Sequence, residues 1–129
     1  MTKNIFNTIV AGIGSILTYC FGGWDTCVIV LVAFMVLDYI TGLINAYIKC
    51  KINSKIGARG IVKKASIFIV LIVAVLLDRL LNSGVWVFRT LVCYFYIANE
   101  GISILENLGK CGVPLPSKLL QALEQLKNK

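Results

Sequence analysis

Four long apolar segments follow one another along this chain, separated by short connections. They cover residues 5–21, 27–48, 65–81 and 85–105, and the second contains a single charged residue, Asp38. A helix needs roughly 20 apolar residues to cross the hydrocarbon core of a bilayer. The hydrophobic share of 58% and the mean hydropathy of +0.85 are also higher than a soluble domain of 129 residues carries. We therefore expect one integral membrane domain.

The segments are expected to be helices and not strands. Backbone polar groups must find partners inside lipid, and a helix supplies them within its own segment. The apolar runs also lack the strict two-residue alternation of a membrane barrel. The fold class predicted is an all-α membrane bundle of three to four short helices, with transmembrane helices at 27–48, 65–81 and 85–105. Residues 49–64 are expected to form a basic loop, and residues 110–129 a tail with a short amphipathic helix.

The net charge of +7 first suggests a nucleic-acid partner, but the positions of the positive residues favour a different cause. Six of them fill the connection between the second and third segments: Lys49, Lys51, Lys55, Arg59, Lys63 and Lys64. Others, including Lys110 and Lys129, follow the fourth segment. Short loops rich in Lys and Arg stay in the cytoplasm, whereas residues 21–26 and 82–84 contain neither residue type. We expect no nucleic-acid partner, a location in the cytoplasmic membrane, and a cytoplasmic C-terminus.

The N-terminal segment, residues 5–21, has a helical amphipathic pattern. One half of the helix is apolar, and the other carries small uncharged residues such as Thr8, Gly12 and Ser15. Three placements remain open. The segment spans the bilayer with its small face on a neighbour, lies in the membrane interface, or lines an aqueous lesion when several chains gather.

Polar residues recur at helical spacing within two of the segments. In the second segment Asp38 lies near mid-membrane, where a charge costs roughly 2.5 to 3.5 kcal/mol, and Thr41, Gly42 and Asn45 follow on the same face. The fourth segment has a matching stripe: Arg89, Cys93, Tyr96, Glu100, Ser103 and Asn107. The two stripes predict a buried polar seam or a wet lumen. The candidates for a pore lining or an oligomer interface are Asp38, Thr41, Gly42, Asn45, Glu100 and Ser103.

The connection at 82–84 suggests one ion pair. Asp78 precedes it and Arg89 follows it by similar distances, so the two charges reach similar depth in an antiparallel hairpin. An intramembrane ion pair between Asp78 and Arg89 is therefore expected. For Asp38 and Glu100 the alternatives stay open: a lysine that reaches in from the basic connection, protonation, or water within an oligomer.

Four stretches of the chain together resemble one known family. They are DYITG at 38–42, NSKIGARGIVKK at 53–64, LLDRLL at 76–81 and YIANEGISILENLGKCGVPLP at 96–116. Their order and spacing are similar to those of the toxin-secretion/phage-lysis holins, over about three quarters of the chain. The resemblance implies a protein that self-associates in the cytoplasmic membrane and opens lesions. Its partners would be membrane lipid, copies of itself, and a passive cargo such as a cell-wall hydrolase or a large protein toxin.

Two other functions fit the same pattern of short helices with an intramembrane acid. A small proton-coupled transporter would use Asp38 to bind a proton and a cationic substrate in turn. A holin antagonist or membrane scaffold would close lesions instead of forming them.

Enzyme chemistry is not expected. The chain has no histidine, no phosphate-binding glycine motif, and no metal-ligand spacing among its five cysteines. We therefore expect no catalytic residues, metal or cofactor.

Overall fold

The computed structural model describes residues 1–83 and 85–127, and its regular elements are all helices, which confirms the all-α prediction. The five helices are α1 (Thr2–Phe21), α2 (Thr26–Ile48), α3 (Ser54–Leu81), α4 (Phe88–Lys110) and α5 (Ser117–Lys127). Gly84 of the predicted outward connection and Lys129 of the predicted tail lie outside the described residues.

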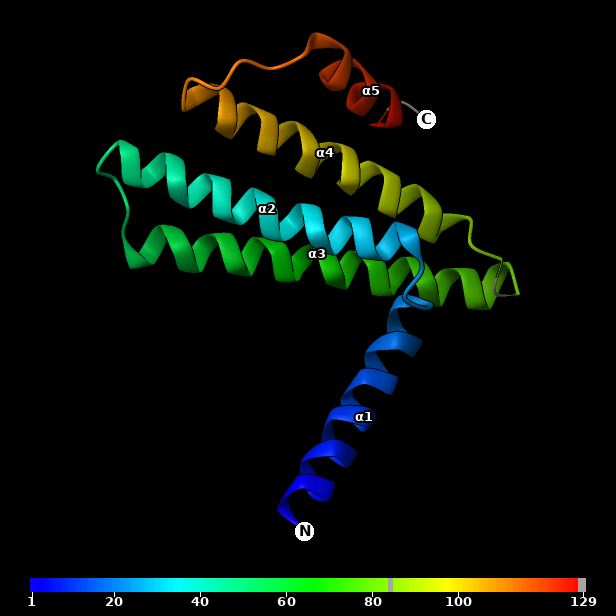
Figure 1. Ribbon diagram of the computed structural model, residues 1–129. Coiled ribbons are helices and arrows are strands. Elements are labelled where there is room, and N and C mark those ends of the chain that lie inside the picture. The colour runs from blue at the N-terminus through cyan, green and yellow to red at the C-terminus, as the bar shows by residue number, and fades with distance from the viewer. Residues whose placement is uncertain (84, 128–129) are drawn as a thin grey trace.

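Helix α4 is the central element of the bundle. It packs against α2, α3 and α5, while α5 folds back along it and α1 points away from the other helices (Figure 1). The core between α2, α3 and α4 is apolar, with Leu31, Leu71, Val75 and Cys93 fully buried. The short connections place α2 and α3 antiparallel to each other, and α3 and α4 likewise.

Three of the described helices are long and apolar enough to cross a membrane: α1, α2 and α3. Helix α4, which overlaps the segment at 85–105 that the sequence predicts as a further membrane helix, is not among them. Arg89, Asn99 and Glu100 lower its hydropathy. Arg89 and Glu100 are buried against the neighbouring helices, so packing and not hydropathy fixes the position of α4.

The prediction of a basic loop over residues 49–64 is wrong for most of its length, because α3 begins at Ser54. The side chain of Asn53 accepts a hydrogen bond from the Ile56 N–H (2.9 Å) and so caps the helix. Gly57 and Gly60 lie inside α3, where they make room for Tyr39 of α2. A Cβ atom at Gly57 would lie 3.2 Å from the Tyr39 hydroxyl, and one at Gly60 would lie 3.3 Å from the ring.

Helix α1 is exposed along almost its whole length. Phe21 at its C-terminal end is its one buried residue, while apolar side chains such as Ile9 and Ile13 face outward. The helix ends at Gly22, whose φ of 78° is a left-handed conformation that favours glycine. The structure thus joins α1 to the bundle at one end only.

Helix α5 docks on α4 through a contact that requires a glycine. A Cβ atom at Gly101 would lie 2.9 Å from both δ carbons of Leu123 and 3.1 Å from Phe34. Leu123 is the one buried residue of α5. The amphipathic helix expected in the tail therefore lies against the bundle, with its apolar face on α4.

Gly101→Leu is expected to displace α5. Overpacking of this kind costs about 1–3 kcal/mol, which raises the detached population by about 5- to 150-fold. Trypsin cleavage at Lys118, in the first turn of α5, should accelerate accordingly. Gly14→Leu is the matched control, because nothing lies within 4 Å of a Cβ at Gly14. Equal cleavage rates in the two variants would contradict the docking contact.

Candidate functional site

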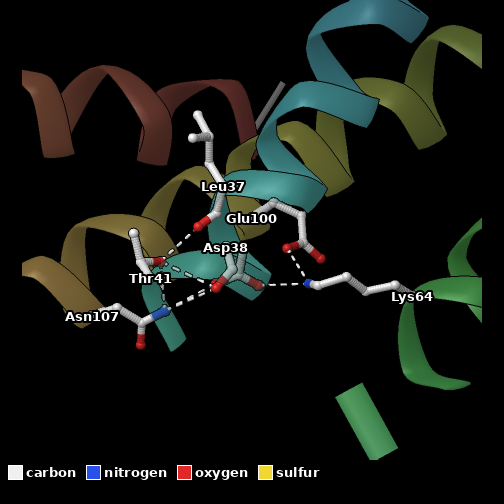
Figure 2. A network of polar contacts seen from close by, with 6 residues as sticks. All are labelled: Leu37, Asp38, Thr41, Lys64, Glu100 and Asn107. Atoms are coloured by element: carbon white, nitrogen blue, oxygen red, sulfur yellow. Dashed lines mark hydrogen bonds and ion pairs between the residues drawn. The ribbon is translucent and has the colours of Figure 1, made fainter. Parts of the chain in front are cut away.

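A cluster of three charged residues joins α2, α3 and α4 inside the bundle. Lys64 Nζ donates to Asp38 Oδ2 and to Glu100 Oε2, each at 2.8 Å (Figure 2). The side chains are 17% exposed for Lys64, 14% for Asp38 and 7% for Glu100. We call Asp38, Lys64 and Glu100 the Lys64 cluster. One ammonium group faces two carboxylates, so each helix contributes one charge to a nearly closed site.

The side chains of Asn107 on α4 and Thr41 on α2 add further hydrogen bonds to this cluster. Asn107 Nδ2 donates to Asp38 Oδ1 (3.2 Å) and to Thr41 Oγ1 (3.0 Å) (Figure 2). The Thr41 hydroxyl in turn donates to the Leu37 carbonyl at 2.8 Å. Asp38 is thus hydrogen-bonded on both carboxylate oxygens by side chains from α3 and α4. Such bonds offset much of the cost of placing a charge away from water.

Lys64 and Asn107 were not among the sequence candidates for this site. The sequence predicts Lys64 in the basic loop as a determinant of topology, and a lysine reaching in from that loop is one of the alternatives for Asp38. The signal for its inward position was helical spacing: Lys64 precedes the buried residues Ile67, Leu71, Val75 and Asp78 on the same face of α3. Asn107 belongs to the polar stripe of the fourth segment, but spacing alone does not distinguish it from the other residues of that stripe.

The structure brings Asp38, Thr41 and Glu100 together and distributes the other three candidates around them. Gly42 lies beside Asn107, whose amide nitrogen would be 3.7 Å from a Cβ there. Ser103 lines an open groove between α3 and α4. The side-chain oxygen of Asn45 is buried without a hydrogen-bond partner among the described residues. A pore-lining role for any of the six stays a prediction.

A second charged cluster lies where the α1–α2 connection meets the start of α4. The side chain of Arg89 is 2% exposed and pairs with Asp25, the residue that caps α2. Nη1 and Nη2 donate to the two carboxylate oxygens at 2.9 Å each, and Nε donates to the Phe21 carbonyl at 2.6 Å. Nη2 also donates to the Gly23 carbonyl. Arg89 therefore holds the connection between α1 and α2 against α4.

The prediction of an ion pair between Asp78 and Arg89 is wrong, because Asp78 bonds to the backbone of Arg89 and not to its guanidinium group. Asp78 is fully buried and accepts the backbone N–H groups of Phe88 (3.0 Å) and Arg89 (2.8 Å), together with the amide of Asn82. These N–H groups lie at the start of α4, where helix geometry leaves them without internal partners and a negative charge is favourable. The two residues are adjacent as expected, but the guanidinium group points to Asp25.

Asp25 lies outside the helices, and its side chain is 52% exposed. The hydrogen bonds from Arg89 lower the pKa of its carboxyl from the ordinary value of 3.8, against a smaller opposing effect of desolvation. The carboxylate is therefore ionised at neutral pH. We call Asp25, Asp78 and Arg89 the Arg89 cluster.

Between the two clusters, the stretches of α2, α3 and α4 contain no charged residue. Asp25 and Asp38 are 13 residues apart in sequence, and Lys64 and Asp78 are 14 apart. At a rise of 1.5 Å per residue, the clusters are separated by about 20 Å along the helices. Each cluster binds groups from three chain segments, so the arrangement fixes how α2, α3 and α4 pack.

Comparison with known proteins agrees with the resemblance seen in the sequence. The family model described as "Bacteriophage holin family" matches residues 15–128. A protein from Bacillus phage phi105 described as "Probable holin" is 38% identical over 94 residues, which cover 72% of this chain and 68% of that protein.

Proteins from bacteria are similar to this chain as well. The "Uncharacterized 14.9 kDa protein in nagH 3'region" of Clostridium perfringens is 55% identical over 130 residues, covering 98% of each chain. The protein YqxH of Bacillus subtilis is 40% identical over 111 residues, covering 85% of this chain and 77% of that protein. No solved structure gives a significant match.

Proposed function

This chain belongs to the bacteriophage holin family, and from that premise we propose that it self-associates in the cytoplasmic membrane and opens lesions. A cell-wall hydrolase or a large protein toxin would leave through them as passive cargo. The observation that carries the proposal is the family match over residues 15–128 of a chain with three helices suited to cross a membrane. In this proposal the positive residues from Lys49 to Lys64 stay in the cytoplasm and determine the orientation, and α4 crosses the membrane after α3, so the C-terminus is cytoplasmic.

Within this function we propose that the Lys64 cluster stabilises the closed bundle before lesions form. Both of its acids pair with one lysine inside a single chain, which lowers the cost of holding them in lipid before lesions form. A lesion lined by Asp38 or Glu100 would then require α2, α3 and α4 to separate. The same pairing weighs against the transporter reading, because a carboxylate held by a lysine is not free to bind a cationic substrate.

Expression of the chain alone in a bacterium tests the proposal. We expect a delay followed by sudden loss of membrane potential and release of a cytoplasmic marker enzyme, because lesions large enough for cargo pass proteins as well as ions. An unrelated three-span membrane protein made to the same level is the control. Depolarisation without release of the enzyme would indicate a small pore that passes ions, and not a lesion large enough for proteins. If neither depolarisation nor enzyme release occurred, the proposal would be rejected in favour of a transporter, a scaffold or an antagonist.

A further inference from the structure

The face of α4 that contacts α5 has a regular spacing of three and four residues. Six uncharged residues repeat at this spacing, and we call them the α4 stripe: Leu91, Tyr94, Ala98, Gly101, Leu105 and Leu108. Two long helices that pack side by side use this spacing. Ala98, Gly101 and Leu105 are buried, and Gly101 lies against Leu123 of α5, which folds back along α4 (Figure 1). The α4 stripe is thus a helix-binding face that α5 occupies.

Helix α5 covers the α4 stripe incompletely. Its 11 residues extend over about 16 Å, whereas the stripe from Leu91 to Leu108 extends over about 26 Å. Leu91 and Tyr94 remain 56% and 40% exposed. A cavity of about 570 Å³ is lined by these two residues together with Leu126 and Lys127 of α5, so the last turn of α5 does not fill this face. The stripe therefore fits a longer helix than α5.

Docked α5 also carries charges to a depth at which α2, α3 and α4 have none. Lys127 Nζ lies 5.9 Å from the centre of the Phe95 ring, and Phe95 is six residues from Arg89 and five from Glu100. Lys127 and Glu124 are both exposed on the docked helix. Where α4 crosses a membrane, these two charges meet hydrocarbon, at a cost larger than the gain from burying Leu123. Water therefore favours the docked α5, and lipid disfavours it.

We propose that in the bilayer α5 leaves the α4 stripe, and that the α4 stripe of a second copy takes its place. This interface rests on the proposed function, since it names the surface through which copies associate. Copies inserted in one orientation run parallel, so a two-fold axis sets each stripe residue against its counterpart. Ala98 and Gly101 then let the two backbones approach closely, as small residues do between membrane helices. Glu100 lies on another face of α4, so the Lys64 cluster stays closed in each copy.

Photo-cross-linking of the full chain in liposomes of phosphatidylglycerol and phosphatidylethanolamine identifies the occupant of the stripe. Benzoylphenylalanine in place of Tyr94 keeps an aromatic side chain at a half-exposed position. We expect a cross-linked dimer in which mass spectrometry finds residue 94 joined to α4 of the second copy. A cross-link to α5 of the same chain would show that α5 stays docked in lipid, and one to α1 of a second copy would assign a different partner. Either result would overturn the proposal.

Two neighbouring aromatic residues provide a matched pair of variants. Tyr94→Ala should raise the dissociation constant of the dimer in liposomes by about tenfold, measured by energy transfer between labelled copies. Phe95→Ala should leave it unchanged, because Phe95 is also 40% exposed but lies outside the α4 stripe. Equal effects of the two substitutions would contradict pairing through the stripe.

Competition between α5 and the second copy is tested from α5 itself. Glu124→Leu/Lys127→Leu leaves the net charge unchanged and removes the two charges that oppose docking in lipid. This double variant should hold α5 on the stripe and weaken association by about tenfold or more. Addition of Leu123→Asn, which disrupts the buried contact of α5, should restore the association of the unchanged chain.

The outcomes separate this interface from the proposed function. If the double variant associates as tightly as the unchanged chain, α5 and the second copy do not compete, and the proposal fails. Release of the marker enzyme by a chain whose association none of these variants alters would overturn the interface and leave the proposed function intact. A chain that stays monomeric in liposomes would overturn both the interface and self-association.

Discussion

Lys64→Met is expected to lower the free energy of unfolding of the detergent-solubilised protein by about 3–5 kcal/mol, the usual cost of removing one partner from a buried ion pair. The variant leaves Asp38 and Glu100 in the bundle without the ammonium group that both contact. Methionine preserves the length and the apolar stem of the side chain, so the change isolates the charge. Thermal unfolding followed by circular dichroism measures the effect.

The neighbouring lysine supplies the matched control. Lys63→Met removes the same charge from an exposed side chain of α3, and surface changes of this kind stay within about 0.5 kcal/mol. The triple variant Lys64→Met/Asp38→Asn/Glu100→Gln should recover most of the loss, because no unpaired charge remains. If Lys64→Met were as stable as Lys63→Met, the Lys64 cluster would have no part in closing the bundle.

Arg89→Met is expected to release the connection between α1 and α2 and to lower the free energy of unfolding by about 2–3 kcal/mol. The loss is smaller than for Lys64 because Asp25 is half-exposed and water can solvate it once its partner is gone. The carbonyls of Phe21 and Gly23 lose their donor at the same time. Chymotrypsin cleavage after Phe21 and Trp24 should therefore accelerate, together with a lower melting temperature.

Two companion variants separate the contributions of Arg89. Asp25→Asn should cost less than Arg89→Met, since the guanidinium group keeps its backbone acceptors and an amide oxygen. Arg89→Lys should restore little, because an ammonium group lacks the fork that binds a carboxylate and two carbonyls together. A cleavage rate in Arg89→Met equal to that of the unchanged chain would show that α1 is held by other contacts.

The class of fold and the polar stripes could be predicted from sequence because both rest on local periodicity. Asp38, Thr41 and Glu100 were selected by helical spacing, and the structure places them in one network. Spacing identifies the face of a helix on which a residue lies but not the partner across the bundle. Asp78 and Arg89 show this limit, since both are buried where the hairpin argument placed them, yet Arg89 pairs with Asp25 from a different connection.

The start of α3 could not be predicted from hydropathy, because Lys55, Arg59 and Lys63 resemble a solvated loop by composition. The helix forms there because Asn53 caps it and because Tyr39 packs against two glycines that alone would suggest a turn. Each cause is a contact that one specific side chain makes with the α3 backbone, and one of these side chains, Tyr39, comes from another helix. The prediction for Lys64 depended on this boundary, since a residue in a loop has no defined face.

The separation of the Lys64 and Arg89 clusters has a mechanical consequence for the bundle. Each cluster joins α2, α3 and α4 at one level, through Asp38, Lys64 and Glu100 at the first and through Asp25, Asp78 and Arg89 at the second. One junction would let a helix pivot on its neighbour, whereas two junctions about 20 Å apart oppose pivoting as well as sliding. The three helices can therefore come apart only when both clusters break.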